Sequence, residues 1–224
     1  MSTYTEIMKI NFSVQNGIDT LITEDFGLKG KRLGLITTVT GLSASLVSSI
    51  DILRERFNLT ALFAPEHGVR GDVDAGGDVA TYTDPRTGLT VYSLYGGDNR
   101  PAPAMLENID MLLIDIQDIG CRFFTFISTM FNAMEECARA GKTFVALDRF
   151  NPINGLGVEG NILDIRFKSF VGIAPIPQRH GLTMGERPSD HQALESDINA
   201  IPRVQKSTRL NSSHLQLSRM PSSA

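Results

Sequence analysis

The stretch Asp110–Phe124, DMLLIDIQDIGCRFF, decides the fold that the sequence predicts. Met111–Ile114 is a short apolar run, which is typical of a strand buried on both faces of a sheet. A cluster of polar side chains follows this run, namely Asp115, Gln117, Asp118 and Arg122. A long helical pattern comes after the cluster. Ligands of open α/β sheets bind at the carboxyl ends of the strands, so this cluster is a candidate site. The alternative for either acid alone is that it only caps the next helix.

Strands and helices alternate on both sides of this central strand. Further short apolar runs predict strands at Arg32–Thr37, Leu59–Ala64, Thr90–Leu94 and Thr143–Leu147. Helical spacing of apolar residues predicts a first helix through Leu46, Ile50, Leu53 and Phe57, a short helix near Pro103–Asn108, and a long helix with Phe124, Ile127, Phe131, Met134 and Ala138 on one face and Gly141 at its end. This repetition predicts an α/β fold with a doubly wound, mostly parallel sheet.

Composition restricts the class of protein and its partners. The chain has 224 residues and a net charge of −4, which argues against nucleic acid or an anionic membrane as the main partner. No apolar run is long enough for a transmembrane helix. Met1–Gly17 has neither the basic segment nor the apolar core of a signal peptide, so the sequence as it stands predicts a cytoplasmic protein. A start further upstream would allow a periplasmic or secreted one.

Polar residues that follow two other strands strengthen the candidate site. Glu66 and His67 come directly after one predicted strand, and Asp148, Arg149 and Asn151 come after another. Neighbouring carboxylates oppose each other's ionisation, and an acid held protonated near neutral pH can act as a general acid. The cluster therefore indicates an active site. The plain alternatives are a hydrogen-bonded loop histidine for His67 and a surface glutamate for Glu66.

Two other functions fit parts of the sequence. A zinc or manganese hydrolase could draw its ligands from His67, Asp72, Asp74, Asp115 and His180, although no HExxH or comparable spacing is present. A non-catalytic sugar- or nucleotide-binding module would also suit the sheet, but no GxGxxG follows the first strand. No metal and no cofactor is predicted.

Several segments together resemble the exo-β-N-acetylmuramidase family. They are LFAPEHGVRGDVDAGGDV, TGLTVYSLYG, IDIQDIGCRFFTFISTM, LDRFNPINGLGVEG and SFVGIAPIPQRHGLTMGE, in the family's order between Gly17 and Glu186. The resemblance implies a glycosidase that removes terminal N-acetylmuramic acid from the non-reducing end of peptidoglycan fragments. It also implies a Rossmann-like catalytic domain, a smaller second domain, and an active site between the two.

The resemblance and the pattern together suggest roles for the polar residues. Glu66 is the expected acid/base, with His67 and Asp118 assisting it. Arg122 is the first candidate to bind the lactyl carboxylate of muramic acid, because a guanidinium pairs with a carboxylate through two hydrogen bonds; an ion pair of Arg122 with Asp118 or Asp148 is the alternative. The remaining predicted substrate-binding residues are Asp72, Asp115, Gln117, Asp148, Arg149, Asn151 and His180. The sequence leaves open whether the reaction retains or inverts configuration.

The chain departs from the family pattern mainly after Glu186. Residues 15–186 are predicted to form the catalytic domain and the start of the second-domain region, and 187–224 a tail foreign to the family. Within this tail, KSTRLNSSH resembles the translation of a sequencing adapter, which makes an assembly artefact the favoured interpretation and a natural disordered tail the alternative. Thr38 and Phe150 stand where the family usually has Asn and Pro. The expected partner is a small muropeptide or disaccharide substrate, with no nucleic acid and no membrane.

Overall fold

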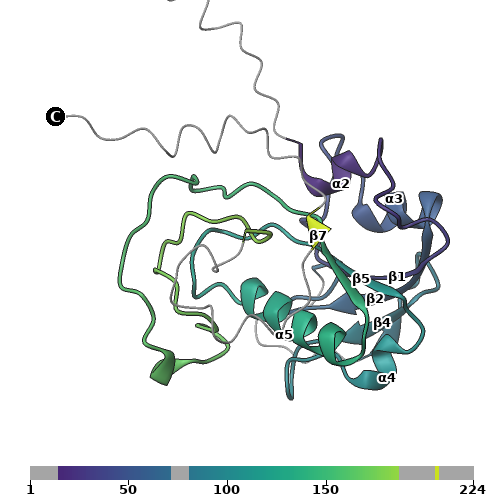
Figure 1. Ribbon diagram of the computed structural model, residues 1–224. Helices are drawn as coiled ribbons and strands as arrows, with labels where there is room; N and C mark the ends of the chain where they lie inside the picture. The colour runs from purple at the N-terminus through teal and green to yellow at the C-terminus, as the bar shows by residue number, and fades with distance from the viewer. Residues whose placement is uncertain (1–14, 72–80, 187–204, 207–224) are drawn as a thin grey trace, which may run out of the picture.

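A mostly parallel sheet forms the centre of the protein (Figure 1), seen in a computed structural model that describes residues 15–71, 81–186 and 205–206. The strand order is β3-β4-β2-β1-β5-β6-β7. The parallel strands are β1 (Arg32–Thr37), β2 (Asn58–Ala64), β4 (Thr90–Ser93), β5 (Met111–Asp115), β6 (Thr143–Ala146) and β7 (Gln205–Lys206). Among the described strands, β3 (Tyr82–Thr83) is the one that pairs antiparallel, and its partner is β4. The predicted α/β fold with a mostly parallel sheet is confirmed, and each predicted strand is present.

The sheet is buried on both faces, which explains its continuous apolar runs. Successive side chains of a strand point to opposite faces, so β1 contributes Leu35 to one core cluster and Ile36 to the other. The cluster around Ile36 includes Phe126 and Met130 of α5 (Phe126–Arg139). The cluster around Leu35 includes Ile50 and Leu53 of α3 (Ser49–Arg56) and Ile18 of α2 (Gly17–Thr20). Helices thus cover both faces, as a doubly wound sheet requires.

The three predicted helices are present and α2 was not predicted, but two predicted stripes begin too early: Phe124 lies before α5, and Leu46 lies before α3. Ser48 caps this helix by accepting a hydrogen bond from the backbone N–H of Ile50, so the helix begins at Ser49. Leu46, predicted on its apolar face, lies before the helix, has a φ of +60° and is 78% exposed. That prediction was wrong, because a cap fixes the start of a helix whatever apolar spacing precedes it. α4 (Pro103–Leu106) is present, and Gly141 follows α5 with the predicted left-handed φ of +64°.

The segment 150–186, called the lobe below, has little regular structure and lies on the α5 side of the sheet (Figure 1). It contains one short 3-10 helix, η1 (Ile165–Phe167). Ala174 and Ile176 of the lobe join the core cluster on the α5 face. Other apolar side chains of the lobe are exposed: Ile153, Leu156, Val158, Ile162, Ile165, Phe167 and Val171. No helix in the described part of the chain is both long and apolar enough to cross a membrane.

Candidate active site at the carboxyl edge of the sheet

Parallel pairing brings the polar ends of four strands to one edge of the sheet. Thr37 at the end of β1 is in register with Asp115 at the end of β5. Pro65 alone separates Glu66 from the end of β2, and Leu147 alone separates Asp148 from the end of β6. Four acids therefore share this edge, and they are called the site acids below: Glu66, Asp115, Asp118 and Asp148. Their partners differ, and the partners decide what each acid can do.

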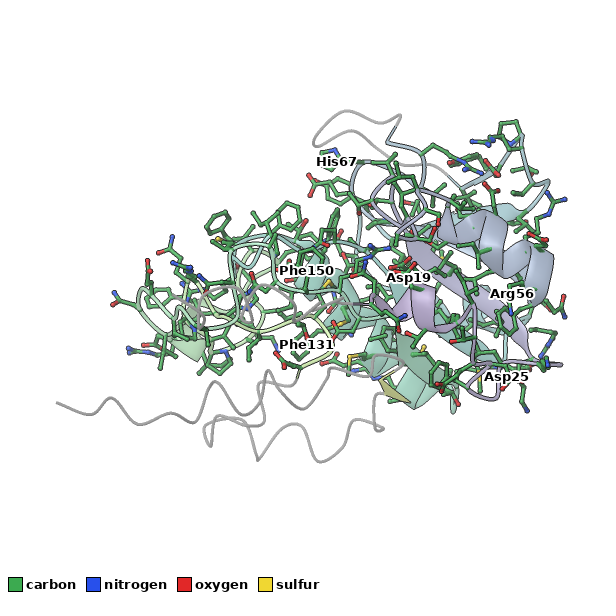
Figure 2. All side chains as sticks on the ribbon, turned by 90° about the horizontal axis from the view of Figure 1, so that it is seen from above. Asp19, Asp25, Arg56, His67, Phe131 and Phe150 are labelled. Carbon is green, nitrogen blue, oxygen red and sulfur yellow. The ribbon has the colours of Figure 1, made fainter. Side chains whose placement is uncertain are left out.

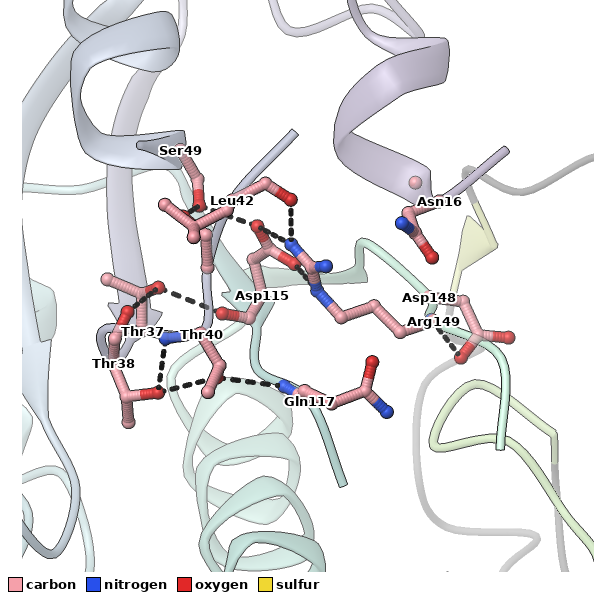
Figure 3. A network of polar contacts seen from close by, with 12 residues as sticks. Asn16, Thr37, Thr38, Thr40, Leu42, Ser49, Asp115, Gln117, Asp148 and Arg149 are labelled. Atoms are coloured by element: carbon pink, nitrogen blue, oxygen red, sulfur yellow. Dashed lines mark hydrogen bonds and ion pairs between the residues drawn. The ribbon is translucent and has the colours of Figure 1, made fainter. Parts of the chain in front are cut away.

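Asp115 is fully buried and forms an ion pair with Arg149 (Figure 3). Arg149 Nε donates to Oδ1 at 2.6 Å, and Nη2 donates to Oδ2 at 3.0 Å. Ser49 Oγ donates to Oδ2 at 2.6 Å, and Arg149 Nη2 also donates to the carbonyl of Leu42 at 2.7 Å. Burial raises the pKa of the Asp115 carboxyl, while Arg149 and Ser49 oppose that rise. This pair joins the ends of β5 and β6, and its geometry favours a structural role over the substrate contacts predicted for both residues.

Asp148 holds the last segment of the lobe against the sheet. Its Oδ1 accepts a hydrogen bond from the backbone N–H of Gly185 at 2.8 Å, and its Oδ2 accepts one from Thr183 Oγ1 at 2.6 Å. A Cβ atom at position 185 would lie 2.7 Å from the Asp148 carboxylate, so only glycine fits there. Contacts with Asp148 thus explain the presence of Thr183 and Gly185 in the HGLTMGE motif.

Asp118 and His180 form a second buried pair, with 6% and 2% of their surfaces exposed. His180 Nδ1 accepts a hydrogen bond from the backbone N–H of Leu182, so the proton of the neutral ring lies on Nε2. Nε2 is 3.5 Å from Asp118 Oδ2, which also accepts from the backbone N–H of Gly120. Within the described residues, neither His180 Nε2 nor Asp118 Oδ1 has a hydrogen-bond partner. The two side chains therefore face each other at a distance that a small shift would shorten to a hydrogen bond.

Glu66 is the one site acid whose side chain is only half-buried. Its Oε2 accepts a hydrogen bond from Thr125 Oγ1 at 3.0 Å, at the residue that precedes α5. His67 has a φ of +74°, a strained conformation for a residue other than glycine, and strained backbone of this kind is concentrated at functional sites. No pattern in the sequence marks Thr125 as a site residue, because nothing local to it indicates that its side chain meets the loop after β2.

Arg122 contacts the lobe rather than another site residue. Its Nη1 donates to the carbonyl oxygens of Asn161 and Ile176 at 2.7 and 2.5 Å, and its backbone N–H donates to Gln178. The ion pair with Asp118 or Asp148 that the sequence left open is absent from the contacts of the described residues. The guanidinium therefore fastens the lobe to the loop after β5.

Gln117 and Asn151 connect neighbouring loops at the same edge. Gln117 Nε2 donates to the carbonyl of Phe150 at 3.1 Å, and Asn151 Nδ2 donates to the carbonyl of Leu182 at 3.0 Å. Gly120 has a φ of +77°, and a Cβ atom there would lie 2.4 Å from Asn151 Oδ1. These contacts make the loops after β5 and β6 and the end of the lobe one packed unit. The predicted substrate contacts of Gln117 and Asn151 stay predictions.

Asp72 and Asp74 lie outside the described residues, so their predicted places in the site stay predictions. Among the residues that the structure does describe, no three His, Cys, Asp or Glu side chains are grouped so that they could hold a metal ion. A pocket at the amino ends of β1 and β2 is lined by Thr23, Glu24, Asp25, Lys29, Arg56 and Phe57. Figure 2 shows Asp25 and Arg56 well apart from His67 and Phe150, so this pocket is separate from the candidate site.

Comparison with known proteins supports a glycosidase family. The family model described as exo-beta-N-acetylmuramidase NamZ, N-terminal, matches residues 33–210. The peptidoglycan beta-N-acetylmuramidase NamZ of Bacillus subtilis (strain 168) is 54% identical over 194 residues, which is 84% of this chain and 47% of that protein.

Two crystal structures of DUF1343 family proteins from Bacteroides fragilis NCTC 9343 resemble the fold. One has a TM-score of 0.75 and 46% sequence identity, and the matched region is 87% of this chain and 50% of that chain. The other has a TM-score of 0.69 and 31% sequence identity, and the matched region is 88% of this chain and 52% of that chain. The chain thus spans about half the length of the relatives that it matches.

Proposed function

Because the chain belongs to the family of the exo-β-N-acetylmuramidase NamZ N-terminal domain, we propose that it is the catalytic half of a glycoside hydrolase. The proposed reaction releases terminal N-acetylmuramic acid from the non-reducing end of peptidoglycan fragments. The proposed substrate is a small muropeptide or disaccharide, in keeping with the name of the Bacillus subtilis relative.

The partial exposure of Glu66 is the structural observation that best supports this proposal, because it identifies the candidate acid/base. Asp115, Asp118 and Asp148 are buried, whereas Glu66 is half-buried and can reach a substrate. Glycoside hydrolysis requires a carboxyl group that exchanges a proton with the glycosidic oxygen or with water. Glu66 could meet this requirement in our proposal: its Oε2 accepts a hydrogen bond from Thr125, and among the described contacts Oε1 has none, which makes Oε1 the oxygen that we expect to contact the sugar.

Recognition of muramic acid requires a cation for the lactyl carboxylate. Arg149 is 7% exposed and already paired with Asp115, so it is poorly placed for this role. Arg122 is half-buried, and only its Nη1 has hydrogen bonds to other described residues among the three guanidinium nitrogens. We therefore propose that Nε and Nη2 of Arg122 bind the lactyl carboxylate while Nη1 holds the lobe.

The second half of the longer relatives would complete this site in our proposal. The lobe lies next to the site and exposes large apolar side chains, among them Phe167 at 70%. Burying such side chains against a further domain would be favourable by the hydrophobic effect. We expect an otherwise identical protein that includes the second domain to turn over substrate faster than the 224-residue chain.

The experiment that tests the proposal is the Glu66→Gln variant. The amide keeps the shape of the side chain but cannot exchange a proton, so release of N-acetylmuramic acid from a disaccharide that carries it at the non-reducing end should fall by about 10²-fold or more. Glu107→Gln, an exposed glutamate before β5, is the matched control and should leave the rate unchanged. Thermal unfolding of both variants should match that of the wild type.

Three results would count against the proposal. If Glu66→Gln keeps more than about a tenth of the wild-type rate, Glu66 is not the acid/base, because general acid–base catalysis contributes about 10²–10⁴-fold. If the wild-type chain binds the disaccharide but never cleaves it, a non-catalytic sugar-binding module becomes the better description of this chain. Loss of activity in excess chelator would instead favour the metal-dependent alternative.

A further inference from the structure

Thr125 occupies the N-cap position of α5 but does not cap the helix. A threonine at this position usually accepts a hydrogen bond from a backbone N–H of the first turn. Here its backbone is helical, with φ −72° and ψ −14°, and its side chain makes no such bond. Its hydroxyl instead donates to Glu66 Oε2 at 3.0 Å. The side chain forgoes a stabilising local contact for one with a residue far away in the sequence.

The two partners differ in how firmly the fold holds them. α5 is fixed by buried side chains in its first two turns, including Phe126, Met130 and Ala133. Glu66 lies in the loop after β2, beside the strained residue His67, and its side chain is half-buried. A glutamate side chain that is free to rotate loses conformational entropy whenever a substrate requires one arrangement. The hydrogen bond from a rigid helix therefore restricts Glu66 before any substrate arrives.

We propose that Thr125 is a positioning residue, which holds Oε2 of Glu66 so that Oε1 faces the glycosidic bond. The inference rests on the proposed function, in which Glu66 is the acid/base. It predicts that the hydroxyl of Thr125 matters for the rate of the bound complex and not for substrate binding, because Thr125 acts only through Glu66.

Three variants of the 224-residue chain test this role. Thr125→Val removes the hydroxyl and keeps the shape, and it should lower kcat by about tenfold with KM little changed, since hydrogen bonds to charged groups are among the stronger ones. Thr125→Ser keeps the hydroxyl and should restore most of the rate. Thr129→Val is the matched control one turn further along α5, because the Thr129 hydroxyl donates only to the carbonyl of Thr125 among the described contacts. It should leave kcat and KM unchanged.

A second measurement decides the contact without any turnover. The carboxyl carbon of Glu66, labelled with ¹³C and identified by its loss in Glu66→Gln, should shift its NMR signal in Thr125→Val but not in Thr125→Ser or Thr129→Val. A signal that stays in place in Thr125→Val would overturn the proposal, as would a rate that the serine variant fails to restore. If the wild type releases no sugar at all, the proposed function fails for this chain, and the NMR signal alone decides whether Thr125 holds Glu66.

Discussion

The Asp115–Arg149 pair should be essential for stability, and Arg149→Met is the variant that tests this. Side chains of the two residues are 0% and 6% exposed, so solvent screens their interaction little. Methionine fills similar space but leaves the Asp115 carboxylate buried with Ser49 as its remaining hydrogen-bond donor. Breaking a buried pair in this way costs about 3–5 kcal/mol of folding free energy. For a protein of this size that corresponds to a fall of about 6–20 °C in Tm.

The loss of stability should depend on pH in a defined direction. Burial raises the pKa of Asp115 in the folded protein, and Arg149→Met removes the main opposing charge, so that pKa rises further above the unfolded value of about 3.9. A carboxyl group with a raised folded-state pKa contributes stability that is present below the unfolded pKa and is lost as pH rises through the folded one. The variant should therefore be closer to the wild type at about pH 5 than at about pH 8.

Thermal and urea unfolding at both pH values measure these effects. The double variant Asp115→Asn/Arg149→Met should be more stable than Arg149→Met alone, because it leaves no unpaired buried charge. Arg166→Met is the control, since the pair that Arg166 forms with Asp164 is on the surface and should contribute nothing measurable. A loss below about 1 kcal/mol that does not vary with pH would refute this account of the buried pair.

Three further predictions concern other contacts of the structure. His180→Ala should lower stability by about 1–3 kcal/mol, because Asp118 is left beside an empty space, and His180→Gln should lose less; equal losses in thermal unfolding would argue against a polar contact between the two. Arg122→Ala should speed hydrogen exchange in the lobe, with Arg122→Lys intermediate, and the ratio of kcat/KM for muramyl over glucosaminyl substrates should fall in both; an unchanged ratio would leave Arg122 with a structural role alone. The half-buried thiol of Cys121 should react with a disulfide reagent in the native protein, whereas Cys137 should react only on unfolding, since burial raises its pKa to about 12. Rapid modification of both thiols in the native state would contradict this.

Local patterns in the sequence were sufficient for the five longer strands of the sheet. β1 has the predicted bounds Arg32–Thr37, and the other four predicted strands agree to within a residue at each end. The two-residue strands β3 and β7 were not predicted. Strands buried on both faces are continuous apolar runs, and such runs are visible without any knowledge of neighbours. The exception at Leu46 has a local cause too, since the cap at Ser48 starts α3 three residues later than the apolar spacing indicates.

Parallel topology also placed the site in general terms. Once the strands are parallel, residues that follow them meet at one edge, and Glu66, Asp115 and Asp148 do so. No pattern in the sequence indicated which of these acids forms its hydrogen bonds with other residues of the protein and which one is left accessible. Such contacts join residues that are distant in the chain, so they depend on how the crossovers and the lobe pack.

The tertiary structure alone decided the partners of the polar residues. Asp115 pairs with Arg149, 34 positions away, and Glu66 accepts from Thr125, 59 positions away. For Arg122 the sequence left open an ion pair with Asp118 or Asp148, yet backbone carbonyls of the lobe accept the hydrogen bonds of its Nη1. The physical reason is that a strand or helix is specified by residues near one another in sequence, whereas a buried charge takes whichever partner the assembled fold brings within hydrogen-bond distance. The sequence therefore determined at which edge of the sheet the site acids gather, and the folded chain determined that Glu66 is the half-buried one among them.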